Sequence, residues 1–382
     1  MFEPSRLERI VAEARRLFAL PEAAKIKVEA NPGDLDRDGY RALRGIGVNR
    51  LSLGVQSLDD GVLREMGRVH TSAHSLAAVA QARAAGYVNV SVDLILGWPG
   101  ESASRWRRNL DGVRAMWPEH VSLYVLEVEG RTVLSHRARR GRLELPDDDL
   151  VADLHAQTVD ALAEMGLAWY EISNFARAGF ESRHNAKYWD DVPFLGFGMS
   201  AHSYRDGRRW WNHATFASYC GAVEKGGAVA AMAAERRLGD RERLAEAAFT
   251  GLRRRGGLDL AGFRARYGAD LLDEYGAALR RPMEAGLLAH EDGRLRLTER
   301  GMLLSNEVLQ AFVEAGQAWT PSNGARRALR PLPVAHAADV HVHERRAGVV
   351  ADAAGLPSDR RAVEVGERDA RKPDVGCLAL HV

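Results

Sequence analysis

Three polar side chains in the first hundred residues interrupt or end apolar stretches, and a fourth stands just before a predicted helix. Asp93 lies inside an apolar run, Glu29 ends another, Gln56 follows Leu-Gly-Val, and Arg68 stands in Met-Gly-Arg-Val-His. A charge within an apolar strand needs a partner or a shifted pKa, so Asp93 is the strongest candidate on its setting alone. Carboxylates and amides hold hydroxyl or amino groups, and a guanidinium holds a carboxylate with two parallel bonds. Together the four residues suit a small polar ligand.

Three of the four candidates also have a structural alternative. Glu29 could stabilise the turn at Asn31-Pro32-Gly33, and Gln56 could lock a loop by a hydrogen bond. Arg68 could be one solvated cation among the 53 lysines and arginines. The residue types alone leave these alternatives open.

Short apolar strands alternating with helices would position these side chains. This alternation indicates βαβ units around a parallel sheet, and the carboxyl ends of such strands form the active face, where Glu29, Gln56 and Asp93 would converge. Five strands are too few for a closed barrel, which favours an arch or a barrel lacking its first units. The predicted strands are 25–30, 50–55, 88–96, 121–128 and 169–172, and the helices between them are 34–43, 71–85, 102–116 and 150–165.

The pattern changes from about residue 237. Three helices, a hairpin around Asp292-Gly293 and a last helix capped by Thr298 predict a small winged-helix-like α+β module. The helices are 244–252, 260–267, 271–285 with a kink at Pro282, and 300–312, and the hairpin strands are 287–290 and 295–297. The predicted domains are a partial barrel at 1–205, a connecting segment at 206–236 and the C-terminal module at 237–313.

Residues 314–382 form a tail rich in Ala, Arg, Pro and Gly with no sustained apolar face. Such a composition cannot bury enough surface to offset chain entropy, so the tail is predicted to be disordered. Its scattered histidines at 336, 341 and 343 are interpreted as solvated and not as a metal site.

Composition excludes several classes of protein. A net charge of +1 argues against binding to nucleic acid or to a membrane surface by bulk electrostatics. The two cysteines, Cys220 and Cys377, cannot form a disulfide framework. No apolar run approaches the ~20 residues of a membrane helix, and no signal peptide opens the chain. A cytoplasmic protein with no integral membrane segment is therefore expected.

The motifs around the four candidates resemble the radical S-adenosylmethionine (SAM) superfamily, in its coproporphyrinogen-dehydrogenase-like (HemN/HemW-like) branch. The matching runs are Glu-Ala-Asn-Pro from Glu29, Gly-Val-Gln-Ser around Gln56, the Met-Gly-Arg-x-His stretch, and the glycine-rich turn after Asp93. The resemblance implies that Glu29, Gln56, Arg68 and Asp93 contact SAM. It covers roughly residues 3–313.

The second half is most similar to the HemW-type haem chaperones of this branch. The block His184-Asn185-Ala186-Lys187-Tyr188-Trp189 carries that similarity. It implies a haem site in which His184 is an axial ligand and Tyr188 contacts the porphyrin or the iron, since imidazole is a good ligand for haem iron. His202 is the competing ligand, and a histidine bonded to loop backbone is the structural alternative for His184.

The family also implies a [4Fe–4S] cluster held by a C-x3-C-x2-C motif, and no such motif precedes Glu29. Two distant cysteines cannot supply three thiolates, so no metal ligands are assigned and no catalytic residue is identified. The chain is therefore expected to be N-terminally incomplete, by a late start codon or true loss, and to lack radical chemistry. An unpaired sheet edge is then expected beside residues 25–30.

The function predicted from these features is a HemW-like haem-binding chaperone that delivers haem to haem proteins. The enzyme alternative is an oxygen-independent coproporphyrinogen III oxidase (dehydrogenase), which would need the cluster for hydrogen abstraction. The non-catalytic alternative is a winged-helix regulator that binds haem or nucleic acid, although the neutral charge balance predicts no DNA binding.

Overall fold

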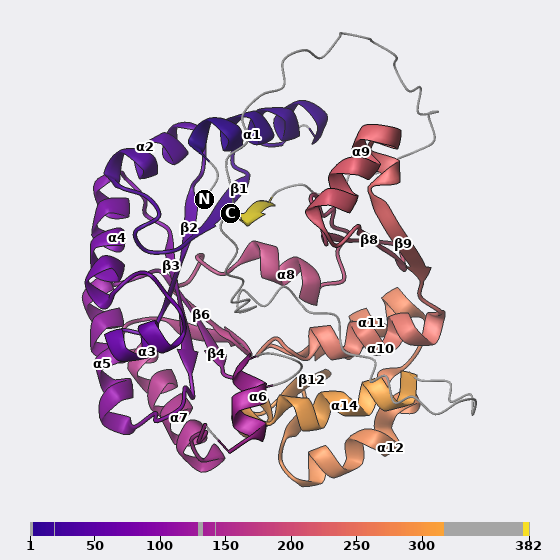
Figure 1. The fold of residues 1–382 in the computed structure, drawn as a ribbon. Helices are drawn as coiled ribbons and strands as arrows, with labels where there is room; N and C mark the ends of the chain where they lie inside the picture. Colours follow the sequence, from indigo (N-terminus) through magenta and orange to yellow (C-terminus); the bar gives the residue numbers. More distant parts are fainter. Residues whose placement is uncertain (1–2, 19, 129–132, 142, 317–376, 382) are drawn as a thin grey trace.

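The protein is described here by a computed structural model, which covers residues 3–18, 20–128, 133–141, 143–316 and 377–381 (Figure 1). A seven-stranded mixed sheet has the strand order β13-β1-β2-β3-β4-β6-β5. Four parallel strands form its centre, and they are β1 (Lys25–Ala30), β2 (Arg50–Gln56), β3 (Val90–Leu96) and β4 (His120–Val125). The predicted α/β arch is confirmed.

Helices cover the outer face of the sheet (Figure 1). They begin at side-chain caps that the sequence supplies, such as Thr71, Ser102 and Asp147, whose oxygens accept backbone N–H groups of the first turn. Apolar side chains between these helices and the strands form the main core, in which Leu53, Val92 and Trp106 are fully buried. The helices on this face are α1 (Pro4–Phe18), α2 (Arg37–Gly45), α4 (Ser72–Ala84), α5 (Ala103–Met116) and α7 (Asp148–Glu164). Two short helices, α3 (Asp60–Glu65) and α6 (Val133–Arg139), contribute to a separate apolar cluster around Ile95 and Trp98.

The sheet departs from the predicted all-parallel arrangement at one edge. The segment predicted as a fifth parallel strand is β5 (Ala168–Glu171), and it forms a hairpin with β6 (Asn174–Ala176). It is β6 that pairs with β4, in antiparallel orientation. A two-residue turn cannot make a parallel crossover, so the sheet reverses direction here.

The opposite edge is covered by β13 (Cys377–His381), which runs parallel to β1 with Lys25 opposite Cys377 and Glu29 opposite His381. The prediction of an unpaired edge beside β1 is therefore wrong. Within the tail predicted to be disordered, 314–316 continue a helix and 377–381 form this strand, whereas 317–376 lie outside the described residues.

The chain then crosses in front of the sheet. Helix α8 (Arg183–Trp189) precedes an antiparallel three-stranded sheet, β7 (His202–Arg205), β8 (Arg208–Asn212) and β9 (Met232–Arg237), with α9 (Phe216–Ala230) between β8 and β9. In Figure 1, α8 lies between the barrel sheet and the C-terminal helices. The stretch predicted as a connecting segment thus contains β8, α9 and most of β9.

The C-terminal group contains the predicted helices and hairpin. Asp292 and Gly293 both have positive φ, 51° and 71°, which is the backbone of a two-residue hairpin turn. Thr298 accepts the backbone N–H of Gly301 and caps the helix that follows. The elements are α10 (Asp240–Gly251), β10 (Leu258–Asp259), α11 (Leu260–Tyr267), α12 (Leu271–Glu284), β11 (Leu288–Glu291), β12 (Arg294–Leu297), α13 (Glu299–Leu303) and α14 (Ser305–Gly316).

Among the described residues, none of the helices is both long and apolar enough to cross a bilayer.

Candidate functional site

The inner face of the barrel sheet is polar. Alternate positions of β1–β4 point away from the helices and line one cavity, because successive side chains of a strand face opposite sides. The sheet contributes Lys27, Glu29, Arg50, Ser52, Ser91, Asp93, His120, Ser122 and Tyr124, and the facing wall contributes Glu171, Ser173, Asn174, Ser182, His184, Asn185, Tyr188, Trp189 and Arg253. Glu29 and Asp93 therefore share a cavity with His184 and Tyr188.

Asp93 is buried at the centre of this inner face, with 5% of its surface exposed. Burial, reinforced by the negative charge of Glu29, raises the pKa of Asp93 to about 6. The hydroxyl of Ser52 donates to the Asp93 carboxyl at 3.2 Å. Glu29 is paired with the ammonium of Lys27 at 2.6 Å. The two acids thus differ in environment, one neutralised by a lysine and one held by hydroxyls.

Arg68 and Gln56 meet at the carboxyl end of β1, around Asn31. The guanidinium of Arg68 donates to the side-chain oxygen of Asn31 at 3.0 Å. A Cβ atom on Gly54 would lie 2.9 Å from Nε2 of Gln56 and 3.4 Å from Oδ1 of Asn31, so the glycine makes room for both amides. Gln56 is 3% exposed with φ of 63°, and no group among the described residues forms a hydrogen bond with its Oε1. This amide oxygen can accept a bond from a ligand.

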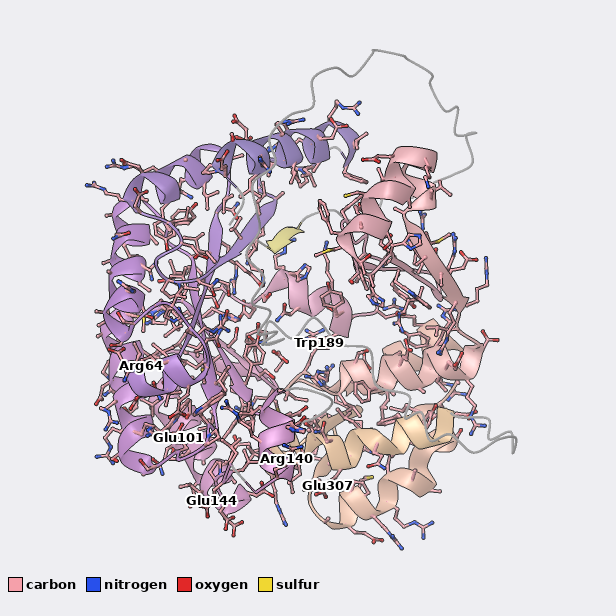
Figure 2. All side chains as sticks on the ribbon, in the orientation of Figure 1. Arg64, Glu101, Arg140, Glu144, Trp189 and Glu307 are labelled. Atoms are coloured by element: carbon pink, nitrogen blue, oxygen red, sulfur yellow. The ribbon has the colours of Figure 1, made fainter. Side chains whose placement is uncertain are left out.

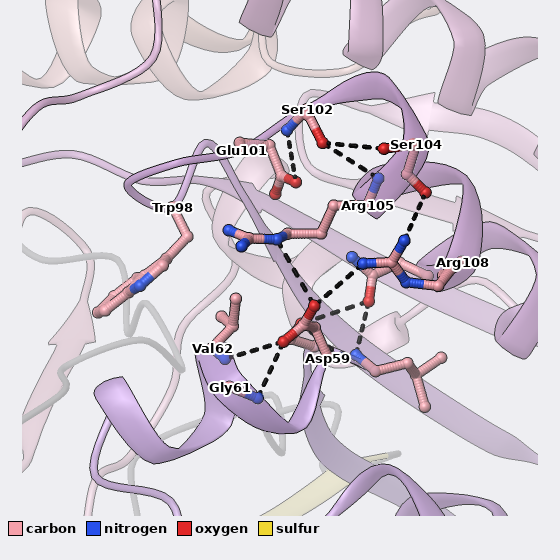
Figure 3. Close-up of polar contacts among 12 residues, drawn as sticks. Asp59, Gly61, Val62, Trp98, Glu101, Ser102, Ser104, Arg105 and Arg108 are labelled. Atoms are coloured by element: carbon pink, nitrogen blue, oxygen red, sulfur yellow. Dashed lines mark hydrogen bonds and ion pairs between the residues drawn. The ribbon is translucent and has the colours of Figure 1, made fainter.

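Charged side chains connect the segments that follow β2 and β3 (Figure 3). Asp59 caps α3 by accepting the N–H groups of Gly61 and Val62, and its other oxygen pairs with Arg108 at 3.1 Å and Arg105 at 3.5 Å. These bonds join α3, which follows Gln56, to α5, which follows the turn after Asp93. The loop after Gln56 and the turn after Asp93 are therefore held at fixed positions relative to each other.

In the same group of loops, Trp98 donates its indole N–H to Glu65 at 2.9 Å, which ties the turn after β3 to α3. Glu101 accepts the N–H of Ser102 at 3.1 Å (Figure 3). Burial raises the pKa of the Glu101 carboxyl. Both contacts stabilise the glycine-rich turn at the end of β3.

The candidate haem residues lie on α8 and contact each other. His184 and Tyr188 are one helical turn apart, and the Tyr188 hydroxyl is 3.1 Å from Nε2 of His184. The two rings are perpendicular, with centroids 5.0 Å apart, and Phe194 packs edge-on against Tyr188 at 4.7 Å. Iron binding through Nε2 of His184 would replace its hydrogen bond to Tyr188.

His202, the competing ligand, lies away from α8 on β7. Its ring stacks on Trp211 with centroids 5.9 Å apart, and burial lowers its pKa. It is absent from the residues that line the cavity containing His184. The structure therefore separates the two histidines.

A buried hydrogen-bonded chain joins the sheet to α8. Nδ1 of His120 is 2.8 Å from the hydroxyl of Ser91, and its Nε2 is 2.9 Å from the hydroxyl of Tyr170. The same Tyr170 oxygen accepts the backbone N–H of Ser182, the N-cap of α8, at 3.1 Å. Burial lowers the pKa of His120 well below its usual value, so this imidazole is neutral at pH 7.

The described residues do not fit a [4Fe–4S] cluster. They contain no group of three or more His, Cys, Asp or Glu side chains that could hold a metal ion. Cys220 lies on α9, well away in the sequence from the SAM candidates, and a three-thiolate site would need one more cysteine than the two in the whole sequence.

Sequence reasoning missed the inner-face residues Lys27, His120, Glu171 and Arg253. A signal for the first two was present, because Lys-x-Glu in β1 and His-x-Ser-x-Tyr in β4 place polar side chains at alternate positions. Glu171 and Arg253 meet only through the fold, and they carry no local pattern.

Two family models match the chain, the radical SAM superfamily over residues 3–111 and the HemN C-terminal domain over 238–304. The heme chaperone HemW of Bacillus subtilis (strain 168) is 35% identical over 292 residues, covering 76% of this chain and 76% of the relative. HemW of Mycobacterium tuberculosis (strain ATCC 25618 / H37Rv) is 38% identical over 313 residues, covering 81% and 76%. The chain belongs to the HemW family of radical SAM proteins.

The fold of this HemW-family chain is also that of a solved relative. Coproporphyrinogen III oxidase (HemN) from Escherichia coli matches with a TM-score of 0.70 at 22% identity, covering 81% of this chain and 74% of that one. At this identity the likeness concerns the fold. The resemblance inferred from the sequence motifs is thus confirmed for the superfamily and for the HemW branch.

Proposed function

We propose that this HemW-family chain binds haem on α8, with His184 as axial ligand, and binds SAM at the carboxyl edge of β1–β3. The observation that carries the proposal is that Glu29 and Asp93 of the SAM set line one cavity with His184 and Tyr188. The relatives that are 35% and 38% identical are named heme chaperones, which supports haem as the ligand. Delivery of haem to haem-accepting proteins is part of the same proposal.

The SAM part rests on complementary groups. Glu29 and Asp93 can accept bonds from hydroxyl or amino groups, Arg68 can hold a carboxylate, and Gln56 has a free acceptor atom. SAM would supply an adenosine and a charged sulfonium amino acid to this edge. The chain's own residues bind and orient it, and no bond cleavage is assigned to them.

The porphyrinogen oxidase alternative has less support. Hydrogen abstraction requires a radical generated at a cluster, and the described residues offer no cluster site. The regulator alternative rests on the helix-and-hairpin form of residues 238–304, which matches a domain found in HemN and so needs no DNA ligand.

Haem titration of the purified chain tests the proposal. We expect a Soret band that is lost or shifted in His184→Ala, because a coordinate bond to iron is removed. His202→Ala is the matched control, since this ring lies outside the cavity, and it should bind like the parent. Tyr188→Phe should alter the band if its hydroxyl contacts the iron or a propionate. Circular dichroism must show that each variant is folded.

An unchanged Soret band in folded His184→Ala protein would remove haem ligation from this helix. Transfer of haem from the loaded chain to an apo haem protein, followed by the acceptor's own Soret band, tests delivery. SAM binding is measured separately by calorimetry on the parent and on Arg68→Ala.

A further inference from the structure

Helix α8 is too short to hold its own position. It has seven residues, and isolated helices shorter than ~12 residues are marginal in water. Two acidic residues, Asp190 and Asp191, follow its last residue, Trp189. Negative charge at a helix C-terminus is unfavourable because the helix dipole is negative there. Contacts from outside the helix must therefore stabilise it.

Those contacts come from the C-terminal domain. Arg254 forms an ion pair with Asp190. Arg266 donates to the backbone oxygens of Asp190 and Asp191, each at 2.8 Å. The Tyr267 hydroxyl donates to Oδ2 of Asp191 at 2.9 Å. We call Arg254, Arg266 and Tyr267 the clamp.

The backbone conformation of Asp191 is further evidence that the clamp holds the end of α8. Asp191 has φ of 51°, a left-handed conformation that is uncommon outside glycine and that persists when surrounding contacts impose it. Arg266 and Tyr267 supply these contacts through the Asp191 carboxylate and carbonyl. The turn that ends α8 is thus shaped by residues about 75 positions later in the chain.

The segment that carries the clamp is also fixed to the barrel. The backbone N–H of Ile172 donates to the oxygen of Arg253 at 3.1 Å, and that of Arg255 donates to Tyr170 at 3.0 Å. The guanidinium of Arg253 lies 4.7 Å from the ring centroid of Trp189. Figure 2 labels Trp189, the last residue of α8. The C-terminal domain therefore touches the end of β5 and the end of α8 through consecutive residues.

We propose that the clamp positions the haem helix, so that haem affinity at His184 depends on Arg254, Arg266 and Tyr267 although they lie outside the residues lining the cavity. This inference rests on the proposed function, in which His184 binds haem. The clamp residues are positioning residues. They set where α8 presents His184 and Tyr188, while the Tyr170 hydroxyl fixes the other end of the helix.

The test compares Arg266→Ala with the parent in the full chain. Arg266 makes three hydrogen bonds to the turn after α8, and its loss should lower haem affinity about tenfold, the equivalent of ~1.4 kcal/mol. Arg296→Ala is the control, because it removes an exposed ion pair to Glu291 within the C-terminal hairpin. The control should bind haem like the parent.

A charge exchange separates positioning from general destabilisation. Arg254→Asp should weaken haem binding, and the double variant Arg254→Asp/Asp190→Arg should recover it by restoring the ion pair with opposite polarity. Amide hydrogen exchange of residues 183–189 is measured on the same proteins without haem. We expect faster exchange there in Arg266→Ala, at an unchanged global melting temperature.

Unchanged haem affinity and unchanged exchange in Arg266→Ala would overturn the clamp. A loss of affinity equal to that of the Arg296→Ala control would also overturn it. If the parent chain bound no haem, the proposed haem-binding function would be wrong. Hydrogen exchange of residues 183–189 would then be the remaining test of the clamp. Faster exchange of α8 in Arg266→Ala would support the clamp, and parent-like exchange would reject it.

Discussion

Asp93 shows how one residue can be unfavourable for folding and useful for binding. Its carboxyl is buried beside Glu29, and this burial raises its pKa to about 6 from the ordinary value of 3.8. A raised pKa in the folded state means that the folded protein prefers the protonated acid. The contribution of the protonated Asp93 carboxyl to the free energy of unfolding is therefore complete at acidic pH. It is lost as the pH rises through about 6.

We therefore predict that Asp93→Asn stabilises the ligand-free protein at about pH 8 by roughly 2–3 kcal/mol and has little effect at about pH 4. The same change should weaken SAM binding about tenfold or more, because it removes the carboxylate. Thermal unfolding across this pH range and calorimetry with SAM provide the measurements. The exposed Asp38→Asn serves as control. A difference between variant and parent that is constant with pH would contradict the argument.

At the scale of elements, the hydrogen-bonded chain through Tyr170 makes a prediction about α8. Tyr170→Phe leaves Nε2 of His120 and the N–H of Ser182 without their partner, so we expect a loss of about 1–3 kcal/mol in the free energy of unfolding. Tyr87→Phe is the matched control, because the hydroxyl of Tyr87 is buried and makes no hydrogen bond within the described part of the chain. Denaturant unfolding of the two variants should differ; equal losses would show that Tyr170 is not a link to α8.

The C-terminal hairpin depends on a close approach at Gly301. A Cβ atom there would lie 1.8 Å from the backbone oxygen of Leu287, so the start of α13 would have to move away from the hairpin. We predict that Gly301→Ala destabilises the protein by roughly 2–4 kcal/mol. Gly276→Ala, in α12 with open space around it, should be neutral or stabilising by up to ~1 kcal/mol. Melting temperatures of both variants measure the difference, and equal values would disprove the close-packing argument.

Some elements were predictable because their signal is local. Strands β1 and β3 are followed directly by Asn31 and Gly97, and the burial of apolar side chains of the central strands on the helix side explains the match between predicted and observed positions. Helix α8 was not predicted, since it is held by Arg254 and Arg266 from the C-terminal domain, and the β5–β6 hairpin was misassigned because β5 alone reads like the other strands.

Part of the candidate site was also predictable, because some of its residues lie within local sequence patterns. Glu29, Gln56 and Asp93 end or interrupt strands, so their position at one edge could be foreseen, and Glu29 and Asp93 do line the cavity. Arg68 lies between α3 and α4, where no strand pattern places it. Their contact with SAM remains a prediction. The Lys27–Glu29 pair and the Asn31 bond to Arg68 follow from side-chain geometry, which spacing alone does not determine.

For the whole molecule, cysteine content leads to a prediction about the cluster. The purified chain should form no [4Fe–4S] cluster after anaerobic reconstitution with iron and sulfide, because two cysteines cannot supply three thiolates. Iron and sulfide analysis with the visible absorption spectrum measures the outcome. A stoichiometry of about four iron and four sulfide per chain would show that other residues act as ligands.

The polar inner face of the sheet has a thermodynamic consequence. Barrels of this class commonly fill their interior with branched aliphatic side chains, whereas this cavity is lined by charged, hydroxyl and imidazole groups. Exposure of apolar surface raises the heat capacity of unfolding and exposure of polar surface lowers it. The inner half of this barrel should therefore contribute little to that heat capacity, and the protein's stability curve should be flatter with temperature than that of an aliphatic barrel of equal length.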